Sequence, residues 1–483
     1  MKQLLHQFQE HQQPDGPIYW VAGLKEKALV GVSGSSKATE LESSSTPKEP
    51  PSSNDDKNDD KDTNTDTSKI SNINKPISPS ESNDIQAVAC QVLHEQDEKG
   101  KDGGVAVVLF VAVARANKLL EIYKTPVAAL PSSKALQPLT IHKSPKRISS
   151  MCFAQVPQSK SSSSNNNNSQ PLTVLVTGDL VGDVWAYSLT HASVHTAYKE
   201  SEQEAATPHR RLLLGHTASM LTTVQMSPQG QFLLSADRDE KIRVTHFPVT
   251  TRIRGFLLGH KAYVSSVDVC DDRYCVSVGG DGALRVWDYS ACDEVATLEL
   301  ASSETAFGTD AVPTKVTVCE RTSDKSFLVG VIYEACSLVD TFLITVVESS
   351  EQVTIQKSVQ IDGLKSQPLA IIPWKRGQVA LLRQDADCLV TCELKSQGAV
   401  ESLVTSSLLD VKDLPDSVLE KDRFGNISMD KNTETRGPAM IMPWNDAARK
   451  ETARTRNKRT RAARKERQKK KQMMLHDGYK SEE

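Results

Sequence analysis

Two histidines at matching places near the middle of the chain are its strongest candidates for chemistry. His216 follows Gly215, and His260 follows Gly259 after an interval of 44 residues. A histidine side chain can bind a metal ion, act as a base, or hold a fixed place in a buried hydrogen-bond network. The residues that follow each histidine decide among these roles.

Ser277, Asp281 and Trp287 follow His260 at spacings that suit one chain of hydrogen bonds. We expect His260 to bond to Asp281 and to Ser277, and Ser277 to accept the indole N–H of Trp287. Each buried polar group then has a partner, which avoids a cost of about 1–3 kcal/mol per group. We therefore interpret His216 and His260 as structural residues and not as metal ligands or bases.

These residues belong to a pattern that occurs twice between residues 211 and 289. Each copy opens with Leu-Gly-His, and the second closes with Leu-Arg-Val-Trp-Asp at 284–288. A period of about 40–45 residues with these ends is the WD-repeat signature, one four-stranded propeller blade per repeat. Seven blades of about 42 residues need about 300 residues, and the chain has 483. The sequence predicts an all-β, seven-bladed WD-repeat β-propeller with disordered insertions and a basic C-terminal tail.

The domain boundaries follow from changes in composition. Residues 1–32 contain a strand pair at 18–32, and a lone hairpin is marginal in water, so we expect this pair to close the propeller by joining a blade from the other end of the chain. Residues 33–83 are polar, with hardly an aromatic side chain, and are expected to be disordered. The propeller is expected over 84–410, with insertions near 158–170 and 191–210. Residues 411–483 form a C-terminal extension.

The first copy of the repeat differs from the second in two ways. Thr245 stands at the position of Trp287, and Asp239 stands at the position of Asp281, while the segment upstream has Val181 at that position. The first copy also carries five consecutive charged residues, 237–241, where a turn needs only Gly, Asn or Asp. One interpretation is a solvated turn. The other is an edge at which a protein partner docks, because charge steers encounter and fixes register.

The segment 449–471 contains thirteen Lys or Arg and two Glu and lacks helix-breaking residues, so we expect a helix when it is bound. The absence of an apolar stripe argues against a helix lying on a membrane. A nuclear import signal, a nucleic-acid arm and a solubilising tail are the three interpretations. We favour RNA contact with strong salt dependence, made by Arg454, Arg456, Lys458, Arg459, Arg461, Arg464, Lys465 and Arg467.

The sequence carries no motif that indicates an enzyme, a metal site or a membrane span. Cys388 with Cys392, and His191 with His195, lack further ligands, so we predict no metal site. The nine scattered cysteines fit a reducing compartment, and no apolar run approaches the length of a membrane span. The sequence has no phosphate-binding loop, nucleophile motif or dinucleotide fingerprint. We expect a binding platform without a cofactor of its own, and not an enzyme.

The run from Ala236 to Val244, followed by Leu258-Gly259-His260, resembles the WD-repeat, non-catalytic subunit of the tRNA (guanine-N7)-methyltransferase. The close resemblance is confined to these two repeats. It implies a heterodimer with a separate catalytic subunit, which binds S-adenosylmethionine and methylates N7 of guanosine in the variable loop of tRNA. The WD-repeat subunit would stabilise that partner and help to seat the tRNA.

The resemblance also implies roles for particular residues. Lys241 and Arg243 would meet acidic side chains of the catalytic subunit, with Arg238 and Glu240 as further contacts. Asp239 is ambiguous because it also stands at the Asp position of the hydrogen-bond chain. The expected location is the nucleus, or the nucleus and the cytoplasm. The alternative is a nuclear WD-repeat scaffold in ribosome assembly or chromatin that uses the same basic tail.

Overall fold

The computed structural model describes residues 5–8, 17–24, 27–33, 35, 38–43, 83–96, 105–132, 134–156, 172–189, 209–217, 219–300, 312–323, 325–334, 336–347, 352–361, 364, 367–375, 377–383, 389–393 and 406–407. The insertion predicted near 158–170, residues 191–208 of the insertion predicted near 191–210, most of 33–83 and the basic segment 449–471 lie outside these ranges. The second insertion was predicted too long, because Arg210 already begins a strand. Residues 434–483 form a separate unit from residues 1–433.

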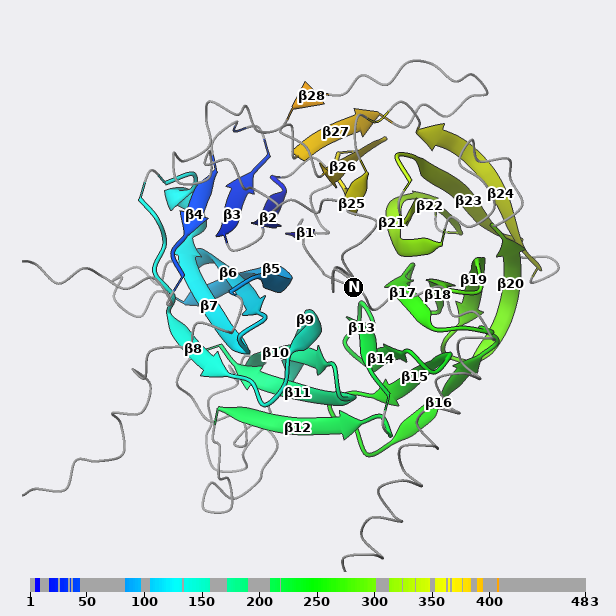
Figure 1. Cartoon of the computed structure of the whole chain (residues 1–483), viewed down its shortest axis with the longest axis horizontal. Coiled ribbons are helices and arrows are strands. Elements are labelled where there is room, and N and C mark those ends of the chain that lie inside the picture. The colour runs from blue at the N-terminus through cyan, green and yellow to red at the C-terminus, as the bar shows by residue number, and fades with distance from the viewer. Residues whose placement is uncertain are drawn as a thin grey trace, which may run out of the picture. The chain divides into compact units, whose positions relative to one another are not determined.

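Seven antiparallel sheets of four strands follow one another around a ring, which confirms the predicted propeller (Figure 1). The first blade contains β1 (Leu5–Phe8), β2 (Tyr19–Leu24), β3 (Lys27–Val32) and β4 (Thr39–Leu41). The second contains β5 (Ile85–Gln96), β6 (Val105–Arg115), β7 (Leu119–Pro126) and β8 (Thr140–Lys143). The third contains β9 (Ile148–Val156), β10 (Leu172–Asp179), β11 (Asp183–Ser188) and β12 (Arg210–Gly215).

The remaining four blades hold the two clear repeats and the later, less regular part of the chain. The fourth blade contains β13 (Leu221–Met226), β14 (Phe232–Asp237), β15 (Lys241–His246) and β16 (Ile253–Leu258), and the fifth contains β17 (Val264–Val269), β18 (Tyr274–Gly279), β19 (Ala283–Asp288) and β20 (Asp293–Glu299). The sixth contains β21 (Pro313–Ser323), β22 (Ser326–Tyr333), β23 (Val339–Val347) and β24 (Gln352–Ile361). The seventh contains β25 (Pro368–Pro373), β26 (Gln378–Arg383), β27 (Leu389–Glu393) and β28 (Ser406–Ser407).

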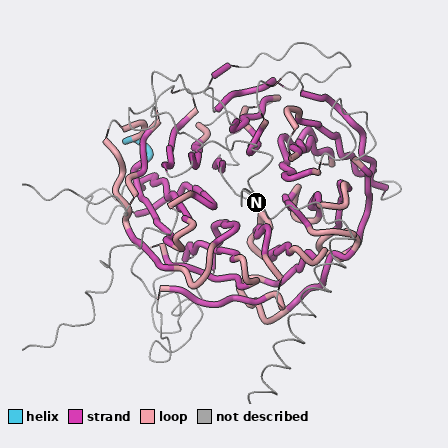
Figure 2. Tube along the Cα trace, in the orientation of Figure 1, coloured by secondary structure: helices cyan, strands magenta, loops and turns pink. Residues whose placement is uncertain are grey.

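Strands account for nearly all regular structure in the described part of the chain (Figure 2). One short 3-10 helix, η1 (Val127–Ala129), follows β7. No helix among the described residues has the length and apolar character needed to cross a membrane.

The closure of the ring differs from the sequence prediction. The hairpin formed by β2 and β3 was expected to join strands from the C-terminal end. Instead β1 and β4, from its own end of the chain, complete its sheet, and the C-terminal strands β25–β28 form a sheet of their own. The prediction was wrong because it missed two short strands, one of which, Thr39–Leu41, lies inside the segment expected to be disordered. The ring closes by contact between β1 and β25.

The core lies between neighbouring blades, because the inner strands bury side chains on both faces. All residues of β18 and β19 are buried, and Val276 and Val286 share a cluster with Phe327 and Val329 of the sixth blade. The outer strands β16 and β20 are mostly exposed. The outer strands are therefore where this scaffold can present side chains to another molecule.

Asp268 on the inner strand β17 ties three blades together. Its carboxylate accepts hydrogen bonds from the Gln225 side chain of the fourth blade at 2.8 Å and from the Val318 N–H of the sixth blade at 2.8 Å. Burial raises the pKa of Asp268, and these hydrogen bonds lower it in part. Such links fix each blade against its neighbours and so hold the outer strands in place.

Candidate protein-docking site on the fourth blade

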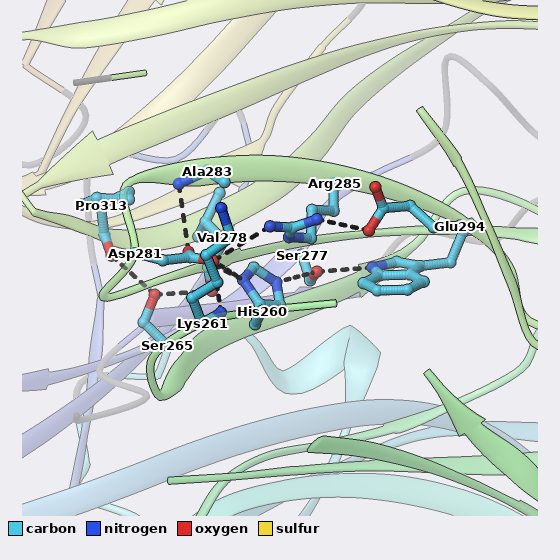
Figure 3. Close-up of polar contacts among 11 residues, drawn as sticks. His260, Lys261, Ser265, Ser277, Val278, Asp281, Ala283, Arg285, Glu294 and Pro313 are labelled. Carbon is cyan, nitrogen blue, oxygen red and sulfur yellow. Dashed lines mark hydrogen bonds and ion pairs between the residues drawn. The ribbon is translucent and has the colours of Figure 1, made fainter. Parts of the chain in front are cut away.

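The fifth blade contains the hydrogen-bond chain that the spacing of its polar residues suggests (Figure 3). Trp287 Nε1–H donates to Ser277 Oγ at 2.8 Å, Ser277 donates to His260 Nε2 at 2.7 Å, and His260 Nδ1–H donates to Asp281 at 3.0 Å. Both histidine nitrogens are occupied within the protein. His260 is therefore placed to hold strands together and not to bind a metal, and no metal-binding cluster is found among the described residues.

Asp281 is the charged end of that chain. Burial raises the pKa of its carboxyl group, but the hydrogen bonds from His260 and from the backbone N–H groups of Lys261 and Ala283 more than offset this, so its pKa falls to about 2. The carboxylate also lies 3.4 Å from Arg285 Nη2. Sequence reasoning missed Arg285, although it stands two residues before Trp287 just as Arg243 stands two residues before Thr245.

The fourth blade builds a shorter version of the same chain. His216 Nε2 bonds to Ser235 Oγ at 2.8 Å, and Nδ1 bonds to Asp237 Oδ2 at 2.9 Å. Thr245 is buried at the tryptophan position. The assignment of Asp239 to the aspartate position was wrong: Asp237 at the end of β14 bonds His216, whereas the side chain of Asp239 is exposed in the turn.

Asp237 uses one carboxylate oxygen for His216 and the other to hold the turn that follows β14. Its Oδ1 accepts the backbone N–H groups of Asp239 and Lys241 at 2.9 and 3.1 Å. The third blade uses the same device: Asp179 ends β10, and its Oδ1 accepts the N–H groups of Val181, Gly182 and Asp183. The aspartate of that blade is thus not replaced by Val181, as the alignment of the repeats suggested, but lies two residues earlier.

The four residues assigned to partner binding lie along the turn and strand that follow Asp237. Arg238 is exposed, and its Nη1 lies 3.5 Å from Met220 Sδ. Glu240 has a positive φ of 73°, which the turn requires. Lys241 is exposed at the start of β15, and Arg243 is half-buried two residues further on. The structure therefore places all four in the β14–β15 turn and at the start of β15, a segment called here the docking edge.

Within the described residues, Arg243 lacks the carboxylate partners that its counterpart in the fifth blade has. The two arginines hold the same position in the strand register: Arg243 lies opposite Ser235, and Arg285 lies opposite Ser277. Arg285 lies 2.5 Å from Glu294 and also near Asp281. Among the described residues, Arg243 instead donates only to Thr245 Oγ1 and to the Gly215 carbonyl, each at 3.2 Å. Burial lowers the pKa of Arg243, so an external carboxylate would favour its charged form.

The remaining sequence candidates fall outside the described part of the chain. These are the basic tail residues Arg454, Arg456, Lys458, Arg459, Arg461, Arg464, Lys465 and Arg467, together with His191, His195 and Cys388. Cys392 is described and is buried as a free thiol.

Seven four-stranded blades, two of which are held by Asp–His–Ser chains, define a WD-repeat β-propeller. The chain belongs to the family of the tRNA methyltransferase TRM82 WD40 domain, whose model matches residues 138–382. That match spans the third to sixth blades and so includes Lys241 and Arg243.

Curated relatives agree with this family. The chain is 35% identical over 144 residues to a protein of Drosophila pseudoobscura pseudoobscura named tRNA (guanine-N(7)-)-methyltransferase non-catalytic subunit wuho, covering 30% of this chain and 32% of that protein. It is 30% identical over 213 residues to wuho of Drosophila melanogaster, covering 44% and 46%. It is 35% identical over 121 residues to non-catalytic subunit wdr4 of Dictyostelium discoideum, covering 24% and 26%. In each case the similarity spans less than half of the relative's length.

A chain in a structure titled "Crystal Structure of Mitotic Checkpoint Complex" aligns with 13% identity and a TM-score of 0.47, covering 85% of this chain and 87% of that one.

Proposed function

We propose that this chain is the non-catalytic subunit of a tRNA (guanine-N7)-methyltransferase complex. It holds a separate catalytic subunit against the outer edge of its fourth blade and helps to seat tRNA for N7-methylguanosine formation in the variable loop. S-adenosylmethionine would bind to the catalytic subunit and not to this chain. Membership of the TRM82 WD40 family and the names of the similar proteins support this assignment.

The observation that carries the proposal is the environment of Arg243. A half-buried guanidinium with only neutral acceptors around it is less well stabilised than one paired with a carboxylate. In the fifth blade, Glu294 and Asp281 meet that need from within the chain. In the fourth blade no described residue does so for Arg243. An acidic side chain of a docked protein would supply the missing charge and fix the register of docking.

A basic cluster on the second and third blades supports a role in seating RNA. Lys143, Lys146 and Arg147 are exposed, and Arg210 Nη1 donates to the Lys143 carbonyl at 3.1 Å. The strand and loop 143–147 and the start of β12 therefore bring these cations together on one part of the surface. Lys and Arg groups bind RNA phosphates with an affinity that falls as salt rises. The basic segment 449–471 would add to this attraction, and a nuclear location, alone or with the cytoplasm, belongs to the same proposal.

Co-purification with a co-expressed tRNA (guanine-N7)-methyltransferase catalytic chain tests the assignment. Arg243→Glu should leave the propeller folded but sharply reduce the yield of the complex, because it places like charges at the contact. Lys261→Glu is the matched control: it makes the same charge change at an exposed residue of the fifth blade. Equal complex yields for both variants would remove the docking role of Arg243.

The same experiment separates the alternative function. A scaffold of ribosome assembly or chromatin would be recovered with other proteins and without a methyltransferase in roughly equal amount. Purified chain alone should show no N7-methylation of tRNA, whereas the reconstituted pair should be active. Activity of the isolated chain would contradict the non-catalytic role.

A further inference from the structure

The outermost strand of the fourth blade, β16, has an unusually apolar exposed face. Ile253, Phe256 and Leu258 are 46%, 40% and 65% exposed. The outermost strand of the fifth blade, β20, instead presents Asp293, Glu294 and Glu299. The two strands have the same place in consecutive repeats, so the difference does not come from the fold.

Two of these apolar side chains share a face with the two cations of the docking edge. In the pairing of β15 with β16, Arg243 is opposite Phe256 and Lys241 is opposite Leu258. Residues opposite each other in an antiparallel pair project to the same face, with Cβ atoms about 4.5–5.5 Å apart. Arg243, Lys241, Phe256 and Leu258 therefore form one surface, called here the β15–β16 surface.

The fifth blade carries different residues at the same register positions. There Arg285 is opposite Thr297, and Ala283 is opposite Glu299. Arg285 is buried and paired with carboxylates of its own blade. The fourth blade differs in two ways. Arg243 lacks a carboxylate partner among the described residues, and the outer-strand positions held by Thr297 and Glu299 in the fifth blade are held by Phe256 and Leu258.

An apolar edge strand left exposed invites non-specific pairing, and natural sheets usually protect such edges with charge or a cover. β16 is the edge of its sheet, and Phe256 and Leu258 leave apolar area along it. Lys241 and Arg243 protect this edge only in part. The combination of cations and apolar side chains points to a specific cover.

We infer that Phe256 and Leu258, with Lys241 and Arg243, bind a protein partner that presents carboxylates beside apolar side chains. The inference rests on the proposed function, because that partner is the catalytic subunit. An RNA backbone would meet the two cations but leave Phe256 and Leu258 without apolar contact. The cations steer the encounter and set its register, and the apolar pair slows dissociation by burying its exposed area.

The test compares the binding of the purified chain and the catalytic subunit over a range of salt concentrations. Phe256→Ser with Leu258→Ser should weaken binding about tenfold or more, as loss of apolar anchors does, without changing the salt dependence. Arg243→Gln should weaken binding and flatten the salt dependence. Val347→Ser, at a 38% exposed valine on the sixth blade, is the matched apolar control. Thermal unfolding checks that each variant is folded. If the double variant does not fold, the single variant Leu258→Gln takes its place in the comparison.

The outcomes distinguish the two proposals. If Arg243→Gln weakens binding and the serine pair does not, the inference about Phe256 and Leu258 is wrong while the proposed function stands. If neither variant matters, the docking edge itself is wrong. If the serine pair abolishes self-association of the chain and leaves methyltransferase binding unchanged, a second copy covers this surface and the inference is overturned.

Discussion

Arg243 and Arg285 occupy the same register position in consecutive blades, but within the described part of the chain only Arg285 meets carboxylates. Arg285 lies 2.5 Å from Glu294 and 3.4 Å from Asp281, whereas Arg243 donates to a hydroxyl and a backbone carbonyl. Arginine at this position therefore forms ion pairs within the fifth blade, whereas in the fourth blade its charge has only neutral acceptors among the described residues.

This difference predicts that removing the charge of Arg285 costs more stability than removing the charge of Arg243. Arg285→Met should lower the free energy of unfolding by about 1–3 kcal/mol, because it removes a charged hydrogen bond and leaves Asp281 with less support. Arg243→Met should cost about 1 kcal/mol or less, because the guanidinium loses only two hydrogen bonds to neutral acceptors near solvent. Urea unfolding of the isolated chain measures both. A larger loss for Arg243 would mean that its main role is structural.

The reassigned aspartate of the fourth blade gives a second test. Asp237→Ala removes the partner of His216 and of two turn N–H groups, so it should lower stability by about 2 kcal/mol or more. Asp239→Ala changes an exposed side chain and should alter stability by less than about 0.5 kcal/mol. Equal losses would restore Asp239 to the hydrogen-bond chain.

The sequence predicted the propeller well because the spacing of Gly-His and Ser reflects contacts that the fourth and fifth blades both make. It failed on the aspartate because residues 237 and 239 are both Asp, and the turn, not the spacing, decides which one reaches His216. Phe256 and Leu258 escaped notice because they flank the buried Leu257. In the one-dimensional pattern, exposed apolar residues of an outer strand look like ordinary core positions. Only the strand order shows that they lie at an edge.

The blades with a weaker repeat pattern replace the histidine chain with other buried polar contacts. In the second blade Arg115 and Glu121 are fully buried and form an ion pair at 2.7 Å. Arg115→Met alone should cost about 3–5 kcal/mol, because it strands a buried carboxylate. Arg115→Met with Glu121→Leu should recover most of that loss. Chemical denaturation of the three proteins would show this recovery, and equal instability of the single and double variants would contradict it.

Deletion of residues 449–471 tests the RNA role of the tail apart from the propeller. The complex without this segment should bind tRNA more weakly at low salt, with a flatter dependence of log affinity on log salt, because fewer phosphate contacts release fewer counterions. Lys143→Ala with Lys146→Ala in the full-length complex asks the same of the basic cluster on the propeller. A salt dependence that is unchanged by the deletion would mean that the tail does not contact RNA.

Asp281 should make the stability of the propeller depend on pH in a defined window. Its folded-state pKa of about 2 lies below the value of about 3.9 for an unperturbed aspartate. A depressed pKa means that the ionised carboxylate favours the folded state; its contribution is complete above about pH 4 and is lost as the pH falls toward 2. Asp281→Asn should therefore be clearly less stable than the native chain at pH 5, and the difference should shrink steadily below pH 4. Urea unfolding of both proteins at intervals between pH 5 and the lowest pH at which they stay folded measures this difference. A stability difference that stays constant or increases as the pH falls would show that the pKa of Asp281 is not lowered in the folded protein.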